Sequence, residues 1–327
     1  MRFLLVRLSS MGDVVLTTPL IRALHRRFPE AEIHFLTRRQ YKPLLQHHPQ
    51  LTAVHEWPPA NSLRDLFWEG VIDLQKNLRT FPLRWQLQYR AFSSFPKENF
   101  RKWLMVRFKK PFLLRHVVER YGRALRKWDI SPDELGPLEV YVPEAVEEKI
   151  HSLLLSSLGE VPRVAVGLGG TYKTKRWLIE YYEVLLNRLK LPVILLGGES
   201  EAREAESLAR MLSVPVVVGA GRFSLLETAA AIRLARLLIS HDTGTAHLGA
   251  AMGTPTAVLW GNTVPEFGMT PWKVPHTNIE VKNLSCRPCS KLGYSTCPRG
   301  HHDCIRALTP DYVEKRLREA FDIARLV

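Results

Sequence analysis

Residues 193–218 read VILLGGESEAREAESLARMLSVPVVV and contain one complete strand–helix–strand unit. The apolar run 193–196 predicts a buried strand, residues 199–212 predict a helix, and residues 214–218 predict a second strand. The same alternation extends on both sides, from a strand at 164–168 to one at 256–260. Short apolar strands that alternate with helices are typical of a parallel sheet covered on both faces. The second half of the chain is therefore predicted to be an α/β domain.

The first half begins in the same way, with strands predicted at 2–8, 32–37 and 71–74 and helices at 14–28 and through 96–128. Residues 129–143 are rich in proline and glycine and predict a linker. We expect two domains, 1–143 and 144–327, with the last helix able to pack back on the N-terminal domain. Open parallel sheets bind ligands at the carboxyl ends of their strands, which predicts a site in a cleft between the domains.

Length and composition exclude several classes of protein. The 327 residues are 46% hydrophobic and 24% charged, as in ordinary globular chains, which argues against disordered and fibrous structure. No stretch approaches the roughly 18 consecutive apolar residues of a membrane-spanning helix. The first apolar run is short and contains Arg7, so we read it as a strand and not as a signal peptide. We expect a cytoplasmic protein.

Most of the excess positive charge lies in one basic-aromatic block, residues 76–128. It contains 15 Lys and Arg residues, two acids and 11 of the 30 aromatic residues, so it carries +13 of the net +14. A localised block of this kind predicts a docking surface for something anionic. A nucleic-acid-binding module is the alternative from another class, although no known nucleic-acid motif supports it.

The first candidate site is the turn Ser9-Ser10-Met11-Gly12-Asp13, which follows the first strand. Asp13 lies at the start of the next helix, where a carboxylate is able to cap the free N–H groups. The alternative is a carboxylate that accepts a proton from a substrate. A helix N-terminus favours the charged form and weakens such a base, so the second role needs compensating burial.

The second candidate is residues 167–177, GLGGTYKTKRW, between a strand and a helix. Glycines, hydroxyls and cations at such a position are typical of an anion cradle, in which Thr171 donates to phosphate oxygens and Lys175 neutralises charge. An ordinary surface loop with solvated lysines is the alternative.

The third candidate is residues 240–247, SHDTGTAH, again between a strand and a helix. Its two histidines and Asp242 are open to two interpretations: a metal site, or a helix cap with His247 packed beneath the loop. Upstream, Glu227 lies near the start of a helix that faces the same edge. No Asp-x-Asp sequence occurs, which argues against a metal–diphosphate clamp.

The fourth candidate is the cysteine cluster, with the spacing C-x2-C-x7-C-x6-C. Four thiols within 19 residues are able to hold zinc, but these spacings are not those of common zinc fingers. Free or partly paired thiols are the alternative. The cysteines are Cys286, Cys289, Cys297 and Cys304.

Taken together, these segments resemble glycosyltransferase family 9, the ADP-heptose:lipopolysaccharide heptosyltransferases, and in the tail the heptosyltransferase II-like branch. The motifs occur in the family's order over residues 1 to about 305. They are RLSSMGDVVLTTP (7–19), the Thr171 to Trp177 loop, SLLE (224–227), DTGTAHL (242–248), GNTVP (261–265) and the cysteine-rich tail from 286.

The resemblance implies two Rossmann-like domains of the GT-B type and an inverting transfer of a sugar from an ADP-sugar, with no metal or other cofactor required. It implies that the acceptor is an anionic glycolipid, the inner core of lipopolysaccharide, and that the enzyme is peripheral on the cytoplasmic face of the inner membrane. By position, Asp13 matches the general base. The implied donor-binding residues are Thr171, Lys175, Glu227, Asp242, Thr243, Gly244 and His247, and the implied acceptor-binding residues are Ser10, Gly12, Lys102 and Arg107.

One motif departs from the family. The stretch that usually reads Gly-Pro-Thr-Asp-Pro, with an aspartate that contacts the sugar, here has Val264 at that place. Valine accepts no hydrogen bond, which leaves three interpretations: a different nucleotide-sugar and another cell-surface glycan, orientation of heptose by Asn262, or lost activity.

Overall fold

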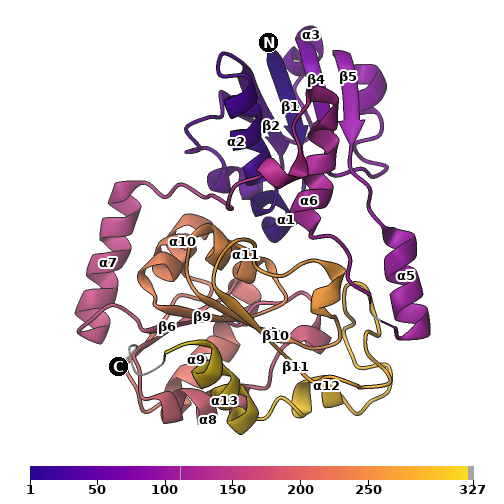
Figure 1. Cartoon of the computed structure of the whole chain (residues 1–327). Helices are drawn as coiled ribbons and strands as arrows, with labels where there is room; N and C mark the ends of the chain where they lie inside the picture. Colours follow the sequence, from indigo (N-terminus) through magenta and orange to yellow (C-terminus); the bar gives the residue numbers. More distant parts are fainter. Residues whose placement is uncertain (111, 323–327) are drawn as a thin grey trace. The chain divides into compact units, whose positions relative to one another are not determined.

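Each half of the chain builds its own parallel β-sheet, as the alternation of apolar runs and helices predicts. The computed structural model describes residues 1–110 and 112–322. The chain divides into a first unit, Met1–Lys97 with Arg115–Tyr141, and a second unit, Glu98–Leu114 with the chain from Val142 onward (Figure 1). The chain passes between the units three times, and the third crossing, from Tyr141 to Val142, lies inside the linker that the sequence predicts.

The sheet of the first unit has the strand order β3-β2-β1-β4-β5, and all its neighbouring strands are parallel. The strands are β1 (Arg2–Val6), β2 (Glu32–Thr37), β3 (Ala53–Glu56), β4 (Phe67–Asp73) and β5 (Gln88–Ser94). The helices are α1 (Met11–Val15), α2 (Thr18–Arg27), α3 (Ser62–Asp65), α4 (Leu83–Gln86) and α6 (Val117–Gly122), with 3-10 turns η1 (Arg39–Leu44), η2 (Arg123–Trp128) and η3 (Pro132–Glu134).

The predicted helix 14–28 is two helices, α1 and α2. Pro19 lies in the first turn of α2, where its missing N–H costs nothing, but its ring would clash with the carbonyl of Val15 in a continuous helix. The hydroxyls of Thr17 and Thr18 donate to the carbonyls of Val14 and Val15 at 2.6 and 2.8 Å. These hydrogen bonds satisfy the backbone carbonyl groups at the end of α1. Asp13 therefore lies in a short helix that is separate from α2.

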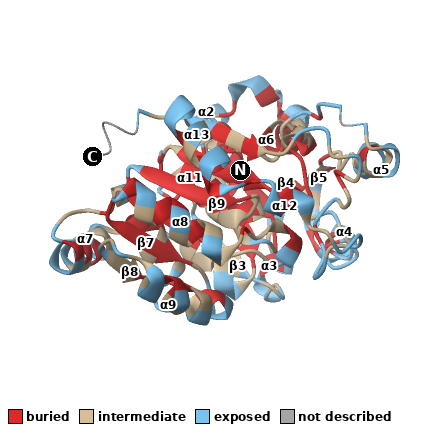
Figure 2. Ribbon diagram, turned by 90° about the horizontal axis from the view of Figure 1, so that it is seen from below, coloured by how far each residue is buried: buried red, intermediate tan, exposed pale blue. Residues whose placement is uncertain are grey.

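The sheet of the second unit has the order β11-β10-β9-β6-β7-β8 and is also parallel. Its central strands are buried along their whole length (Figure 2), which explains their continuous apolar sequences. The strands are β6 (Val164–Gly167), β7 (Val193–Leu196), β8 (Val216–Val218), β9 (Leu237–His241), β10 (Thr256–Trp260) and β11 (His276–Glu280). The helices are α5 (Asn99–Phe108), α7 (Glu144–Leu158), α8 (Ile179–Leu189), α9 (Ala202–Met211), α10 (Leu225–Leu234), α11 (Gly244–Ala251), α12 (Asp303–Arg306) and α13 (Pro310–Ala320), with 3-10 turns η4 (Lys173–Lys175), η5 (Glu199–Glu201) and η6 (Pro265–Phe267).

The observed units differ from the predicted division at one segment. Segment 98–114, which the sequence places in the N-terminal domain, belongs to the second unit because Met105 and Leu114 pack against Val264 and Phe267. The last described helix, α13, lies on α8 and β11 of the second unit, since its apolar face joins the core of that unit.

Candidate active site

Asp13 lies just beyond the carboxyl end of β1, and its carboxylate has four donors around it. The guanidinium of Arg7 pairs with Oδ2 at 2.7 Å, and the backbone N–H and hydroxyl of Ser10 donate to the same oxygen at 3.2 and 3.0 Å. The Tyr121 hydroxyl donates to Oδ1 at 3.1 Å. Asp13 therefore caps α1, as one of the two interpretations from sequence has it, and its carboxylate is also the centre of a larger polar network.

These contacts decide the charge of Asp13. Burial raises the pKa of its carboxyl, but the Arg7 guanidinium and the Ser10 hydrogen bonds outweigh burial and hold the pKa below the ordinary value. Burial, together with the negative charge of Asp13, raises the pKa of the Tyr121 phenol, which keeps it a neutral donor. Asp13 is thus an ionised carboxylate at neutral pH.

Of the predicted acceptor-binding residues, Ser10 touches Asp13 and Gly12 is buried in α1 beside it. Lys102 and Arg107 lie on α5, in the second unit. Sequence reasoning missed the roles of Arg7 and Tyr121. Arg7 was the one charge in the first apolar run, which is a usable signal, whereas Tyr121 lies 108 positions from Asp13 and only folding brings them together.

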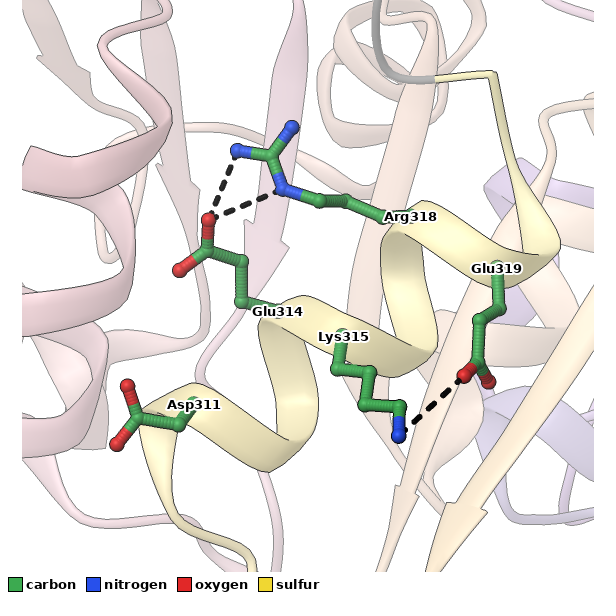
Figure 3. A pocket seen from close by; sticks show the side chains of 5 residues that line it. All are labelled: Asp311, Glu314, Lys315, Arg318 and Glu319. Carbon is green, nitrogen blue, oxygen red and sulfur yellow. Dashed lines mark hydrogen bonds and ion pairs between the residues drawn. The ribbon is translucent and has the colours of Figure 1, made fainter.

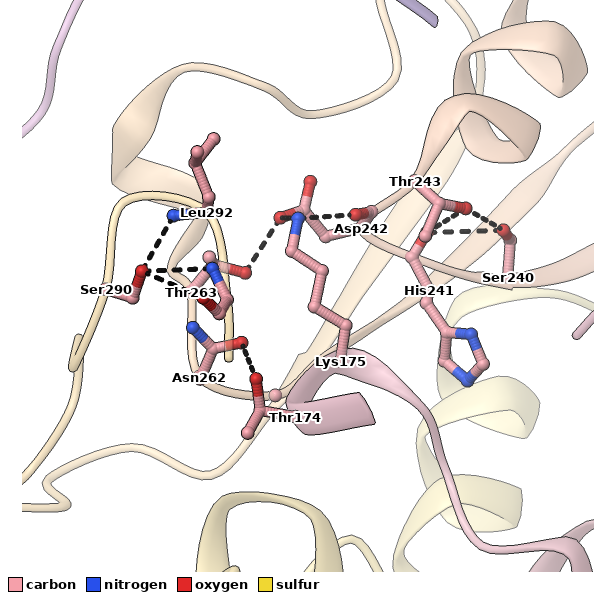
Figure 4. Close-up of polar contacts among 12 residues, drawn as sticks. Thr174, Lys175, Ser240, His241, Asp242, Thr243, Asn262, Thr263, Ser290 and Leu292 are labelled. Carbon is pink, nitrogen blue, oxygen red and sulfur yellow. Dashed lines mark hydrogen bonds and ion pairs between the residues drawn. The ribbon is translucent and has the colours of Figure 1, made fainter. Parts of the chain in front are cut away.

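In the second unit, Lys175 and Asp242 form the centre of a second polar cluster (Figure 4). The Lys175 ammonium donates to Oδ2 of Asp242 at 2.6 Å and to its backbone carbonyl at 2.8 Å. The Thr263 hydroxyl also donates to Oδ2, at 2.7 Å. Burial raises the pKa of Asp242, but the ammonium and the Thr263 hydroxyl outweigh it and lower the pKa overall.

Two contacts hold the lysine loop against this cluster. His241 is buried, and its Nε2 accepts the backbone N–H of Trp177 at 2.8 Å, so the ring is neutral, with burial lowering its pKa to about 4. Gly261 lies so close to the loop that a Cβ there would lie 2.4 Å from the carbonyl oxygen of Thr174. His241 is therefore a structural anchor of the lysine loop.

The other predicted donor-binding residues have different surroundings. Thr243 caps α11 and Gly244 begins it, so free N–H groups of that helix lie beside Asp242, while His247 is buried in the same helix. Thr171 is exposed. Glu227 caps α10 through the backbone N–H of Ser224 at 2.8 Å and pairs with Lys149 of α7 at 2.5 Å.

Comparisons with known proteins identify the family of the chain. The family model described as "Glycosyltransferase family 9 (heptosyltransferase)" matches residues 60–297. The chain belongs to glycosyltransferase family 9. It is 26% identical over 326 residues to lipopolysaccharide heptosyltransferase 1 of Pseudomonas aeruginosa, covering 89% of this chain and 86% of the relative.

Two solved structures share its fold. ADP-heptose lps heptosyltransferase II of E. coli has a TM-score of 0.76 at 20% identity, covering 99% of both chains. E. coli heptosyltransferase WaaC with ADP has a TM-score of 0.71 at 20% identity, covering 98% of this chain and 100% of that one. The chain is therefore a glycosyltransferase of the GT-B type, built from two Rossmann-like units, as the motifs predict. Among the described residues, no helix is long and apolar enough to cross a bilayer.

Val264 of this glycosyltransferase is 4% exposed and belongs to the apolar cluster that holds segment 98–114. Asn262 is buried as well, and its Oδ1 accepts the Thr174 hydroxyl at 3.1 Å. Both residues thus hold the loops of the second unit together.

The cysteines are free thiols, and burial raises the pKa of Cys304 to about 12. Within residues 1–110 and 112–322, no three His, Cys, Asp or Glu side chains are placed to hold a metal ion. Among the described residues, the four cysteines therefore do not form the zinc site that their spacing allows.

A pocket on the outer face of α13 is lined by charged side chains that pair with each other (Figure 3). Arg318 donates to Glu314 at 2.8 Å, and Lys315 lies 4.0 Å from Glu319. No predicted site residue lines this pocket.

Proposed function

We propose that this glycosyltransferase moves heptose from ADP-heptose to the inner core of lipopolysaccharide, by an inverting and metal-independent displacement. The observation that carries the proposal is the ionised carboxylate of Asp13, held by Arg7 and Tyr121 at the carboxyl end of β1. One related protein is named a lipopolysaccharide heptosyltransferase and another an ADP-heptose lps heptosyltransferase. These names support the choice of substrates.

Asp13 acts as the general base. It takes the proton of the acceptor hydroxyl as that oxygen bonds to the anomeric carbon, while the bond from this carbon to the diphosphate breaks and ADP leaves. A single displacement inverts the carbon and needs no second carboxylate as nucleophile. A carboxylate with a lowered pKa is a weak base, so its contribution depends on exact placement by Arg7, Ser10 and Tyr121.

The second unit binds the donor. Lys175 and Thr171 contact the diphosphate, together with the N–H groups at the start of α11 at Thr243 and Gly244. Lys175 leaves Asp242 to neutralise the charge that develops on the departing diphosphate, which is the task a metal has in other transferases. Glu227 releases Lys149 and binds the ribose, and His247 supports the loop of Asp242.

The acceptor is an anionic glycolipid, which Ser10, Gly12, Lys102 and Arg107 bind at the cytoplasmic face of the inner membrane. Support for peripheral membrane contact is the basic charge of segment 98–114 and its exposed aromatic residues. Phe100, Trp103 and Phe108 are 69%, 49% and 58% exposed. Aromatic side chains among cations suit the interface of an anionic bilayer.

The test is Asp13→Asn, which removes the base and keeps the shape of the side chain. Turnover with ADP-heptose and inner-core acceptor falls by about 10²–10⁴-fold, the usual contribution of a general base. The matched control is Asp65→Asn, which changes an exposed carboxylate of the same unit and leaves turnover unchanged. Transfer by Asp13→Asn at the parental rate would falsify the base assignment.

Donor binding is measured on the same variants by thermal-shift titration with ADP, UDP and GDP. ADP alone stabilises the parent and Asp13→Asn equally, because the donor residues lie in the second unit. Stabilisation by UDP or GDP in place of ADP would contradict the ADP-sugar.

A second candidate is transfer of another nucleotide-sugar to a different cell-surface glycan. The burial of Val264 among apolar side chains favours it, because that position offers the sugar no hydrogen-bond acceptor. Transfer assays with a panel of ADP-sugars separate the two candidates.

A further inference from the structure

Besides the Lys175 loop of the second unit, the structure has a group of three cations beside Asp13, all of them in the first unit. Strands β1, β4 and β5 are neighbours in the sheet, and their carboxyl ends lead to Arg7, Lys76 and Lys97. Because parallel strands end at the same edge, these three cations are brought to one place. Two hydrogen bonds fix the segment after β5: the Lys76 ammonium donates to the carbonyl of Phe95 at 2.9 Å, and Arg120 donates to the carbonyl of Lys97 at 3.3 Å.

A chain of contacts links this segment to Asp13. The Tyr121 hydroxyl donates to Asp13, and the Tyr121 ring packs edge-on against Phe95 with centroids 4.7 Å apart. Lys97 follows Phe95 by two residues. Burial and the neighbouring cations Arg7 and Lys76 lower the pKa of Lys97, which agrees with this placement.

The two carboxylates whose negative charge acts on Lys97 are Asp13 and Asp73, and both are already occupied. Asp13 is paired with Arg7. Asp73 accepts the backbone N–H groups of Gln75 and Lys76 at 2.9 and 2.8 Å, and its other oxygen accepts the hydroxyl of Thr80. In the part of the chain that the structure describes, no carboxylate lies within 4.0 Å of the half-buried Lys97 ammonium. A cation in that situation is suited to an anion supplied by a ligand.

Gln75 adds a neutral donor at the same edge. Its side-chain oxygen accepts the backbone N–H groups of Leu8 and Ser9 at 3.0 and 3.3 Å, which ties the end of β4 to the turn that carries Asp13. Across the described residues its NH2 group has no acceptor, so it remains available for a ligand oxygen.

We propose that Lys97 and the Gln75 amide form a subsite for a carboxylate or phosphate of the acceptor, next to the hydroxyl that Asp13 deprotonates. This subsite rests on the proposed function, because it assumes a sugar acceptor at Asp13. A charge-assisted hydrogen bond to Lys97 fixes the orientation of the acceptor, which improves its binding more than the chemical step.

The test compares Lys97→Met with Lys42→Met, which removes a lysine of the same unit that lies outside the basic-aromatic block and pairs with Glu56 at 3.1 Å, and which leaves the KM for acceptor unchanged. The KM of each variant is measured with three forms of the inner-core acceptor: the intact form, a form freed of phosphate with hydrogen fluoride, and a form with reduced carboxyl groups. Lys97→Met raises the KM for intact acceptor at least tenfold and changes the KM for ADP-heptose less than twofold. The increase in KM disappears with the acceptor form that lacks the group bound by Lys97, and this result identifies the group. The variant Lys97→Arg restores most of the acceptor binding.

Two outcomes overturn the subsite: an acceptor KM of Lys97→Met within twofold of the parent, or an equal loss with all three acceptors. Binding of intact acceptor is also measured without donor, by titration calorimetry. A parent that transfers no heptose but binds the acceptor through Lys97 contradicts the proposed function and supports the subsite. A parent that neither transfers heptose nor binds the acceptor contradicts both.

Discussion

Asp13 shows how much one side chain depends on its partners. Arg7 and Ser10 lower its pKa below the ordinary carboxyl value of 3.8. A general base works in its deprotonated form, so kcat/KM falls when the pH drops through that pKa. In the role proposed for Asp13, we expect the acid limb of the parent on the low-pH side of the ordinary aspartate range, because the Arg7 guanidinium and the Ser10 hydrogen bonds lower the pKa of this carboxyl.

We predict that Arg7→Gln moves the acid limb to higher pH, by about one to three units, because burial then acts on Asp13 without the guanidinium. The pH dependence of kcat/KM measures the shift. Arg26→Gln, which removes an exposed ion pair to Glu134 in the same unit, serves as the control and leaves the limb in place. An unshifted limb in Arg7→Gln would show that another group limits the reaction at low pH.

At the scale of elements, the sequence predicts the buried strands well, and it predicts only β8 of the four strands at the edges of the sheets. The missed strands β3, β5 and β11 all lie at an edge. An edge strand has one pairing partner and more exposed side chains, so it needs no continuous apolar run. The sequence of β5, QYRAFSS, therefore reads as polar. The split of helix 14–28 was signalled by Pro19, whose position in a first turn is a known preference.

The contact between the lysine loop and the loop from Gly261 is also an element-scale feature that leaves little trace in the sequence. We predict that Gly261→Ala destabilises the protein by about 1–3 kcal/mol, since its Cβ would meet the Thr174 carbonyl at 2.4 Å and force the loops apart. Urea unfolding measures the change in the free energy of unfolding, and thermal-shift titration measures the loss of ADP binding. Gly136→Ala, whose Cβ would have no neighbour closer than 3.8 Å, leaves both nearly unchanged. Parental ADP binding in Gly261→Ala would mean that this contact does not shape the donor site.

At the scale of the whole molecule, the basic-aromatic block is continuous in the sequence and divided in the structure. Residues 76–97 and 115–128 belong to the first unit, and residues 98–114 belong to the second. Both units therefore carry cations of this block.

We predict that the protein binds vesicles containing anionic lipid, and that binding weakens at least about tenfold between low and high salt, because each cation near the surface contributes about 1 kcal/mol that salt screens. Co-sedimentation with anionic and neutral vesicles measures this. Trp103→Ser combined with Phe100→Ser weakens binding, whereas Phe67→Ser, an exposed aromatic residue outside the block, does not. Binding that is insensitive to salt would argue against an electrostatic surface.

The sequence by itself determined the two parallel sheets, the turns that carry Asp13, Lys175 and Asp242, and the concentration of charge, because hydrophobic periodicity and the residues at strand ends are local properties. Only the tertiary structure decided which partners those side chains have. Arg7 with Tyr121 around Asp13, Lys149 on Glu227, and Val264 against Met105 are contacts between distant positions, set by packing of apolar faces that no local pattern specifies. For the same reason segment 98–114 joined the second unit: its buried residues found their apolar partners there.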